Sequence, residues 1–158
     1  MAKEKVLPWS ETCFVCGDAN PFGLRIKFVD RGDDVIVRTT VDRHFEGYPG
    51  RVHGGVVTAL LDETIGWACS VKAHKMLYTV EIKVRFRKPV PGGEELIVRG
   101  WCSEMHKRFA KGQGQIEGRD GTVMVSAEGL YFPVPDAEET KIIPMLKMPG
   151  RPAQPGDY

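Results

Sequence analysis

The sequence lacks several features that would assign a function directly. It has no apolar run of membrane-spanning length free of charge, so we expect no membrane partner. Lys and Arg number 22 and Asp and Glu 21, and a net charge of +1 gives no broad basic surface for nucleic acid. No phosphate-loop or dinucleotide glycine motif occurs, so nothing indicates ATP hydrolysis. The first residues also lack the apolar core of a signal peptide, and we therefore expect a cytoplasmic protein.

The length and composition fit one globular domain without internal repeats. The chain has 158 residues, of which 42% are hydrophobic, which is enough for a substantial core. We divide it into an N-terminal segment with a Cys-x-x-Cys turn (residues 1–23), a folded domain (24–132) and a proline-rich tail (133–158). The tail is expected to be extended, either lying on a dimer surface or disordered.

Alternating apolar and polar residues predict an antiparallel sheet. Residues 24–28 and 35–41 are expected to form a hairpin, and the alternation is longest over residues 78–87. Further strands are predicted at 95–102, 109–117 and 122–132, the last after a strong Asp-Gly turn signal. With one helix near residues 54–72, the chain belongs to the α+β class, as a curved antiparallel sheet of five to six strands around one long central helix.

The predicted helix carries two acidic side chains between its ends and no basic side chain to pair with them. Between Arg51 and Lys72 the only ionised side chains are Asp62 and Glu63, and no Lys or Arg lies three or four residues from Asp62. Burial of an unpaired carboxylate on an apolar helix face costs several kcal/mol of stability. Both acids are therefore candidate functional residues. A solvated helix edge is the alternative explanation, and it suits Glu63 better because the face of Asp62 is the more apolar.

The start of this helix can bind an oxygen that carries negative charge. His53 precedes Gly54 and Gly55, whose backbone N–H groups are unpaired in the first helical turn and are not covered by a Cβ atom. Together with the acid two turns later, this turn suggests an oxyanion site plus a base or nucleophile. His53 has two possible roles, a catalytic hydrogen bond or a structural helix cap.

The distance along the helix predicts a homodimer. From Gly55 to Asp62 a helix advances about 10 Å, whereas one carbonyl group needs both the N–H donor and the nucleophile within about 3–3.5 Å. One helix cannot supply both. If both groups are catalytic, a second copy of the chain contributes one of them across a two-fold axis.

The motif resembles that of a known family. Residues 47–62 include the His-Gly-Gly turn and an acid nine residues after His53, residues 13–24 include Cys-Phe-Val-Cys-Gly, and residues 84–93 follow the helix. These segments resemble the hotdog-fold acyl-CoA thioesterases of the PaaI-like branch. The resemblance implies hydrolysis of an acyl-CoA thioester by Asp62 as general base or nucleophile, with the N–H of Gly55 polarising the carbonyl at a site between subunits. It implies a homodimer or a dimer of dimers, and no cofactor, since coenzyme A is part of the substrate.

The resemblance also implies roles for residues after the helix. Thr79 matches a Ser or Thr whose hydroxyl supports the acid or the attacking water, although a solvent-facing Thr is the alternative. Glu81 and Phe86 would then flank the pantetheine channel. Some relatives carry Asn at the position of Gly47, and its replacement here leaves the placement of water undecided.

A basic connector is a candidate site for the phosphates of coenzyme A. His106, Lys107 and Arg108 cluster between two predicted strands, and a nucleotide carries several negative charges. Solvated turn charges are the alternative.

Cys13 and Cys16 have the spacing of a metal or redox motif. Neither a second Cys-x-x-Cys nor a nearby His pair completes a tetrahedral zinc site. We therefore expect reduced structural thiols and no metal, with a metal or redox module as the alternative.

Two other functions remain open on the same fold. A non-catalytic acyl-CoA-binding protein would not need Asp62, and an enoyl-CoA hydratase or dehydratase typically needs a different arrangement of His and acid. The acyl group that the site accepts is not encoded in any motif, because it depends on which side chains close the gap between subunits.

Overall fold

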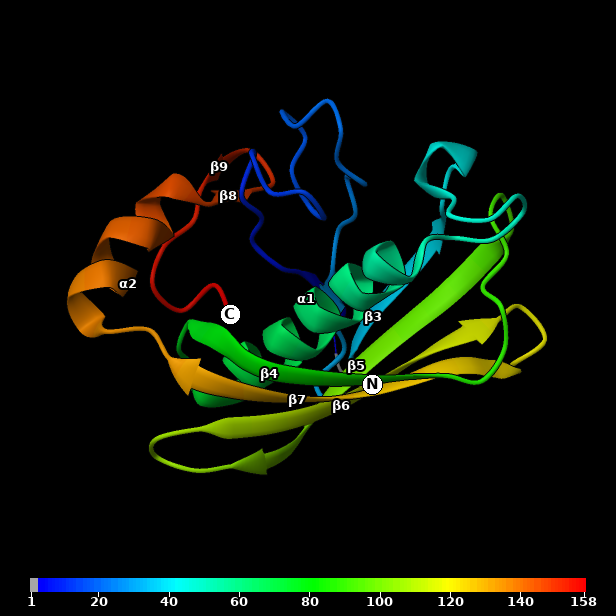
Figure 1. Cartoon of the computed structure of the whole chain (residues 1–158). Helices are drawn as coiled ribbons and strands as arrows, with labels where there is room; N and C mark the ends of the chain where they lie inside the picture. Colours follow the sequence, from blue (N-terminus) through cyan, green and yellow to red (C-terminus); the bar gives the residue numbers. More distant parts are fainter. Residues whose placement is uncertain (1–2) are drawn as a thin grey trace.

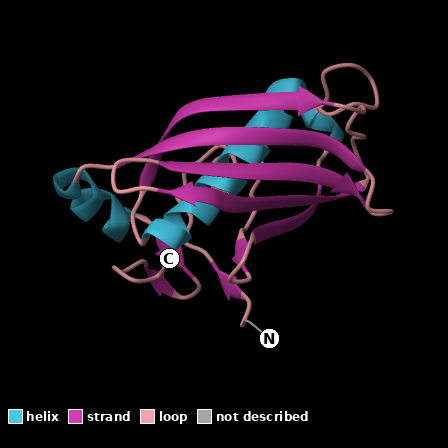
Figure 2. Ribbon diagram, turned by 90° about the horizontal axis from the view of Figure 1, so that it is seen from below, coloured by secondary structure: helices cyan, strands magenta, loops and turns pink. Residues whose placement is uncertain are grey.

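The computed structural model describes residues 3–158, and it consists of one long helix set against a curved antiparallel sheet (Figures 1 and 2). The α+β class and the arrangement of a sheet around a central helix are confirmed. The sheet has seven strands, slightly more than the five to six expected, because two short strands extend one edge. In spatial order the strands are β1 (Lys5–Val6), β2 (Val29–Asp30), β3 (Val35–Thr40), β5 (Glu95–Met105), β6 (Ala110–Gly118), β7 (Val123–Pro133) and β4 (Leu77–Phe86).

The strand predicted at residues 24–28 is wrong. These residues form irregular chain, although Ile26 and Phe28 are buried as their alternation suggested. The N–H of Leu24 donates to the Phe14 carbonyl and that of Ile26 to the Val15 carbonyl. Their backbone bonds therefore go to the N-terminal segment and not to the sheet, and the left-handed conformation of the intervening Arg25 (φ 57°) interrupts an extended strand.

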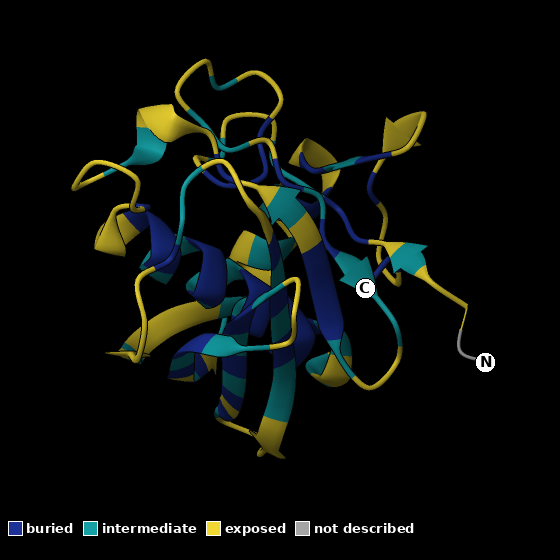
Figure 3. Cartoon of the chain, turned by 90° about the vertical axis from the view of Figure 1, so that its right-hand side faces the viewer, coloured by how far each residue is buried: buried dark blue, intermediate teal, exposed yellow. Residues whose placement is uncertain are grey.

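Helix α1 (Gly54–Ala73) packs into the concave face of the sheet. Buried positions gather where the helix meets the strands, and exposed positions lie in the outer loops and along the edge strand β4 (Figure 3). Two strand glycines admit the helix closely. A Cβ on Gly100 would lie 2.8 Å from the carbonyl oxygen of Thr64, and one on Gly112 would lie 2.4 Å from Cγ2 of Ile65. A short 3₁₀ turn, η1 (Arg43–Phe45), precedes the loop that leads into the helix.

The C-terminal residues pack against the body, in contrast to the extended or disordered tail expected. They form α2 (Asp136–Ile142), the 3₁₀ turn η2 (Ile143–Met145) and a small hairpin of β8 (Lys147–Met148) and β9 (Arg151–Pro152). The last residue, Tyr158, is buried and its ring meets Trp67 of α1 edge-on, with centroids 5.8 Å apart. Aromatic contact with the helix thus orders a segment whose proline content alone suggested disorder.

Over the residues that the structure describes, no helix combines the length and the apolar character needed to cross a bilayer.

Candidate active site

Asp62 lies in the middle of α1 and accepts hydrogen bonds from two hydroxyl groups. Oγ1 of Thr79, on β4, lies 2.9 Å from Oδ1 of Asp62. The hydroxyl of Tyr131, on β7, lies 3.2 Å from the same oxygen and 3.1 Å from the Asp62 backbone carbonyl. Among the described residues, none makes a salt bridge with Asp62. The helix acid is therefore held by neutral donors, which leaves its charge uncompensated.

Burial raises the pKa of Asp62 above its ordinary value, and the hydrogen bonds from Thr79 and Tyr131 oppose that rise. A carboxylate whose basicity is increased by partial desolvation is a better proton acceptor than one in water. Its two hydroxyl partners also fix the orientation of the carboxyl group.

An irregularity in β4 turns Thr79 toward the helix. The register pairs Thr79 with Tyr131 but Glu81 with Leu130, so Val80 is an extra residue in the strand. Since side chains alternate along a strand, this bulge places Thr79 and Ile82 on the same face, the face that meets α1. A strict alternation over residues 78–87 would have put Thr79 on the face opposite Ile82. The hydrogen bond between Thr79 and Asp62 thus depends on the bulge.

Tyr131 was not identified from the sequence. Its strand was predicted, but nothing local indicates that position 131 lies beside position 62, which is 69 residues earlier. The pairing register of β4 and β7 makes the contact, because it sets Tyr131 directly opposite Thr79.

The start of α1 carries the predicted glycine turn, and His53 caps it. The N–H of Gly55 donates to Nδ1 of His53 across 2.9 Å, so this imidazole nitrogen is an acceptor and carries no proton. The N–H of Gly54 has no acceptor within the described part of the chain. Of the two roles considered for His53, the geometry therefore displays the helix cap, and one backbone donor remains free beside it.

A cavity of about 670 Å³ opens at this turn. The ring of Phe86 covers Gly54, where an added Cβ would lie 3.5 Å from its Cζ atom. Glu81, by contrast, pairs with Leu130 and lies on the sheet face directed away from the helix. The cavity is lined by Gly47, Tyr48, Arg51, Val52, His53, Gly54, Phe86, Arg87, Lys88 and Pro89.

Asp62 lies in a second cavity, of about 440 Å³, which shares no lining residue with the first. Its wall is mostly apolar and includes Trp67 and Leu77 beside Thr79 and Tyr131. In one copy of the chain, the glycine turn and the acid therefore face different spaces. This separation agrees with the distance argument made from the sequence.

The predicted basic connector lies far from the glycine turn within one copy of the chain. The turn between β5 and β6 holds His106, Lys107 and Arg108, and the His106 ring stacks on Phe109 with centroids 4.3 Å apart. The register places this turn at the end of the sheet where β4 begins, whereas Phe86 and the glycine turn lie at the other end.

Three other basic residues line the cavity at the glycine turn, namely Arg51, Arg87 and Lys88. No sequence motif groups these three residues. Their positions beside the helix motif and at the end of the strand over residues 78–87 were the available signal. The sequence does not show that the fold places Arg51 beside Arg87 and Lys88.

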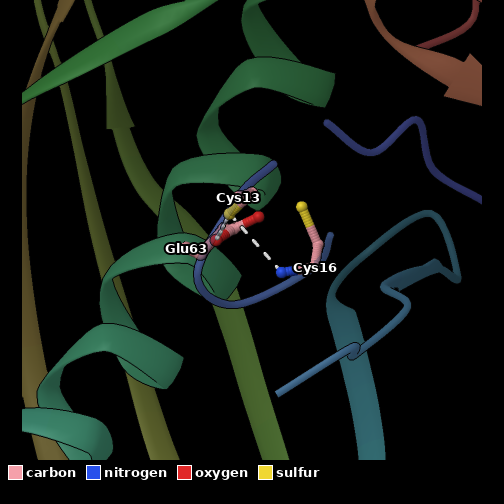
Figure 4. Close-up of side chains that lie close together, drawn as sticks. All are labelled: Cys13, Cys16 and Glu63. Carbon is pink, nitrogen blue, oxygen red and sulfur yellow. Dashed lines mark hydrogen bonds between the residues drawn. The ribbon is translucent and has the colours of Figure 1, made fainter. Parts of the chain in front are cut away.

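The N-terminal Cys-x-x-Cys turn lies against α1 next to Asp62. Sγ of Cys13 is 3.2 Å from Oε2 of Glu63, and the Cys16 side chain lies close to both (Figure 4). Burial raises the pKa of Glu63 to about 8, while hydrogen bonds from the thiol and backbone of Cys16 lower the pKa of Cys13. Glu63 is only partly exposed and contacts the Cys13 thiol, so it does not lie on a fully solvated helix edge. All three residues line the second cavity with Asp62.

Comparison with known proteins shows what this chain is similar to. The thioesterase superfamily model matches residues 49–125, which include the glycine turn and Asp62. A crystal structure of a thioesterase superfamily protein is 31% identical, with a TM-score of 0.72, and the match covers 77% of this chain and 60% of that chain. This chain therefore spans less than two thirds of that relative.

Two further structures share the fold. A Streptococcus mutans UA159 protein bound to acetyl CoA is 22% identical over 65% of this chain and 82% of its own, with a TM-score of 0.61. The E. coli PaaI protein from the phenylacetic acid degradation operon is 16% identical over 70% and 80%, with a TM-score of 0.64. The resemblance to the hotdog thioesterases and the hotdog fold are confirmed.

Proposed function

We propose that this chain, a hotdog protein that carries the helix motif of the thioesterase superfamily, hydrolyses the thioester bond of an acyl-CoA. The observation that supports this best is the environment of Asp62. Its carboxylate is partly buried, has no cationic partner among the described residues, and is oriented by two hydroxyl groups at the wall of a mostly apolar cavity. Such a group is suited to accept a proton or to attack a carbonyl carbon.

In the proposed reaction the thioester carbonyl oxygen binds at the first turn of α1 in one subunit. The free N–H of Gly54 and the N–H of Gly55 stabilise the negative charge that develops there. The N–H of Gly55 then donates to the thioester oxygen, either in addition to His53 or in place of it. Asp62 of the other subunit either deprotonates a water molecule or attacks the carbon itself. A carbon–oxygen bond forms, the carbon–sulfur bond breaks, and the coenzyme A thiolate leaves. In the route through the Asp62 anhydride, water hydrolyses the intermediate.

Strand β4 is the proposed contact between subunits. It forms one edge of the sheet and exposes several large apolar side chains, with Val80 and Phe86 each 52% and Tyr78 47% exposed. An unpaired edge that carries apolar residues is a favourable surface for a second strand. Pairing of two β4 strands would bring the acid of one copy toward the glycine turn of the other, in a dimer or a dimer of dimers.

Coenzyme A phosphates are proposed to bind Arg51, Arg87 and Lys88. These side chains line the cavity that also contains the glycine turn, where the thioester is proposed to bind. The turn of His106, Lys107 and Arg108 remains the second candidate, because a partner subunit could bring it to the same cavity.

The test is a hydrolysis screen of the wild type and Asp62→Asn over a panel of acyl-CoA esters. The release of the coenzyme A thiol measures hydrolysis. We expect the substitution to lower kcat by at least about 100-fold while the oligomer stays intact. Glu128→Gln is the matched control, since Glu128 is an exposed carboxylate on the outer side of β7.

Full activity of Asp62→Asn would overturn the assignment. Tight binding of acyl-CoA without hydrolysis by the wild type would instead identify a non-catalytic binding protein. Addition of water to an enoyl-CoA would identify a hydratase.

A further inference from the structure

Two thiols and one carboxylate converge beside the proposed catalytic acid, from parts of the chain that are about 50 residues apart. Cys13 and Cys16 belong to the N-terminal segment, and Glu63 belongs to α1 (Figure 4). We propose that these three residues bind one zinc ion. The site goes beyond the proposed hydrolase function and does not depend on it.

The distances fit a single small metal ion. One Sγ atom from each cysteine and one carboxylate oxygen of Glu63 all lie within 4.8 Å of one another, and the Cys13–Glu63 pair is 3.2 Å apart. In a tetrahedral zinc site with bonds of about 2.3 Å to sulfur and about 2.1 Å to oxygen, ligand atoms are about 3.5–4 Å apart. The three groups therefore need only small side-chain shifts to reach that geometry.

Backbone N–H groups around Cys13 orient its sulfur in the way that metal-binding thiolates are oriented. The N–H groups of Val15 and Cys16 both point at Sγ of Cys13, at 3.3 and 3.4 Å. Donors of this kind orient a thiolate and stabilise its charge. The turn is also tightly closed by Gly17, where an added Cβ would lie 2.6 Å from the Cys13 carbonyl oxygen. These contacts together hold the conformation of the Cys-x-x-Cys-Gly turn.

A disulfide explains this cluster less well. Oxidation of Cys13 and Cys16 would remove the thiol that now bonds to the Glu63 carboxyl group. No described residue forms a salt bridge with Glu63, so its carboxylate would be left partly buried and unpaired. A divalent ion instead satisfies all three groups together, and two thiolates favour zinc over magnesium or calcium.

Three protein ligands leave one tetrahedral position for water. All three residues line the cavity that also contains Asp62 and Thr79, so that position is open to solvent and to small ligands. The ion would also tie the irregular N-terminal segment to α1, next to the acid.

The experiment measures zinc binding by the full chain, after metal removal under reducing conditions, with calorimetry and metal analysis. Cobalt(II) serves as a spectroscopic probe. We expect one ion per chain, a thiolate-to-cobalt charge-transfer band with tetrahedral ligand-field bands, and an increased Tm with zinc. Cys13→Ser, Cys16→Ser and Glu63→Gln should each weaken zinc binding by at least about 100-fold, more than the loss of an outer partner would.

Cys102→Ser is the matched control, because Cys102 lies outside the cluster, and it should bind zinc as the wild type does. Circular dichroism of each variant without metal separates lost binding from lost folding. The proposal is overturned if the folded wild type binds no zinc, if the three variants bind it as tightly as the wild type, or if cobalt gives no thiolate band.

Discussion

The Thr79 hydroxyl donates to the Asp62 carboxylate across 2.9 Å, which connects the edge strand β4 to the centre of α1. This bond couples the proposed catalytic acid to the strand that we propose as the subunit contact. A shift of β4 on dimer formation would therefore reach the acid directly.

Removal of the Thr79 hydroxyl should lower activity and move the pH profile. For Thr79→Val we expect kcat to fall by about 10- to 100-fold, as for the loss of a hydrogen bond to a charged group. The Thr79 hydrogen bond lowers the pKa of Asp62, so its loss raises that pKa. Because the base must be ionised, the acid limb of kcat/KM should move to higher pH. Thr79→Ser keeps a hydroxyl and should retain both the rate and the limb, and an unchanged limb in Thr79→Val would contradict the proposed contact.

Sites shared between subunits should be restored by mixing two inactive chains. Gly55→Pro removes the N–H donor in the first helical turn, where no intrahelical hydrogen bond is lost, and Asp62→Asn removes the base. Each pure variant should be inactive, whereas a mixed dimer purified through two different tags should contain one working site. Gly55→Ala, which keeps the N–H, is the control for the helix start. No recovery of thiol release in verified mixed dimers would show that the two groups do not serve one substrate.

The two candidate sites for the coenzyme A phosphates, the cavity at the glycine turn and the connector between β5 and β6, lead to different predictions. If Arg51 and Arg87 contact the phosphates, the double variant Arg51→Ala/Arg87→Ala should raise the Kd for coenzyme A by about 10-fold or more at low salt. The corresponding Lys107→Ala/Arg108→Ala variant should have a smaller effect. Calorimetric titration with coenzyme A and with dephospho-coenzyme A measures both, and the reverse order would assign the phosphates to the connector.

The C-terminal hairpin should contribute stability that depends on pH. Arg151 donates two hydrogen bonds to Asp157, at 2.8 and 2.7 Å, and these lower the pKa of Asp157 from 3.8 to about 2. A lowered pKa in the folded state stabilises the fold above the unfolded value, and this stabilisation is lost as the pH falls from about 4 toward 2. For Asp157→Asn we expect a loss of about 1 kcal/mol at neutral pH, or about 2–4 °C in Tm.

The difference in Tm between the wild type and Asp157→Asn should shrink as the pH is lowered through this range. Asp33→Asn, at an exposed carboxylate, should leave the Tm unchanged at every pH. A constant difference between pH 4 and 2 would show that the Arg151 pair does not act through its charge.

Much of the fold could be predicted because its signals are local. The helix after His53 and the strands at 35–41, 78–87, 95–102, 109–117 and 122–132 follow from periodicity and turn residues, and the structure places elements at each. The prediction of a strand at 24–28 was wrong because alternation indicates burial and does not reveal which segment of the chain supplies the hydrogen-bond partners. The prediction of an extended or disordered tail was wrong because composition does not reveal the contact of Tyr158 with Trp67.

The sequence by itself determined that Asp62 lies on an apolar helix face, that a glycine turn begins this helix, and that about 10 Å of helix separates the two. These depend on neighbours along one helix, where spacing in sequence fixes spacing in space. Only the tertiary structure decided that Thr79 and Tyr131 hold Asp62, and that Cys13 and Cys16 meet Glu63. Those contacts arise from strand register, a one-residue bulge and the packing of a distant loop, because burial of the shared core brings together residues that no local pattern relates.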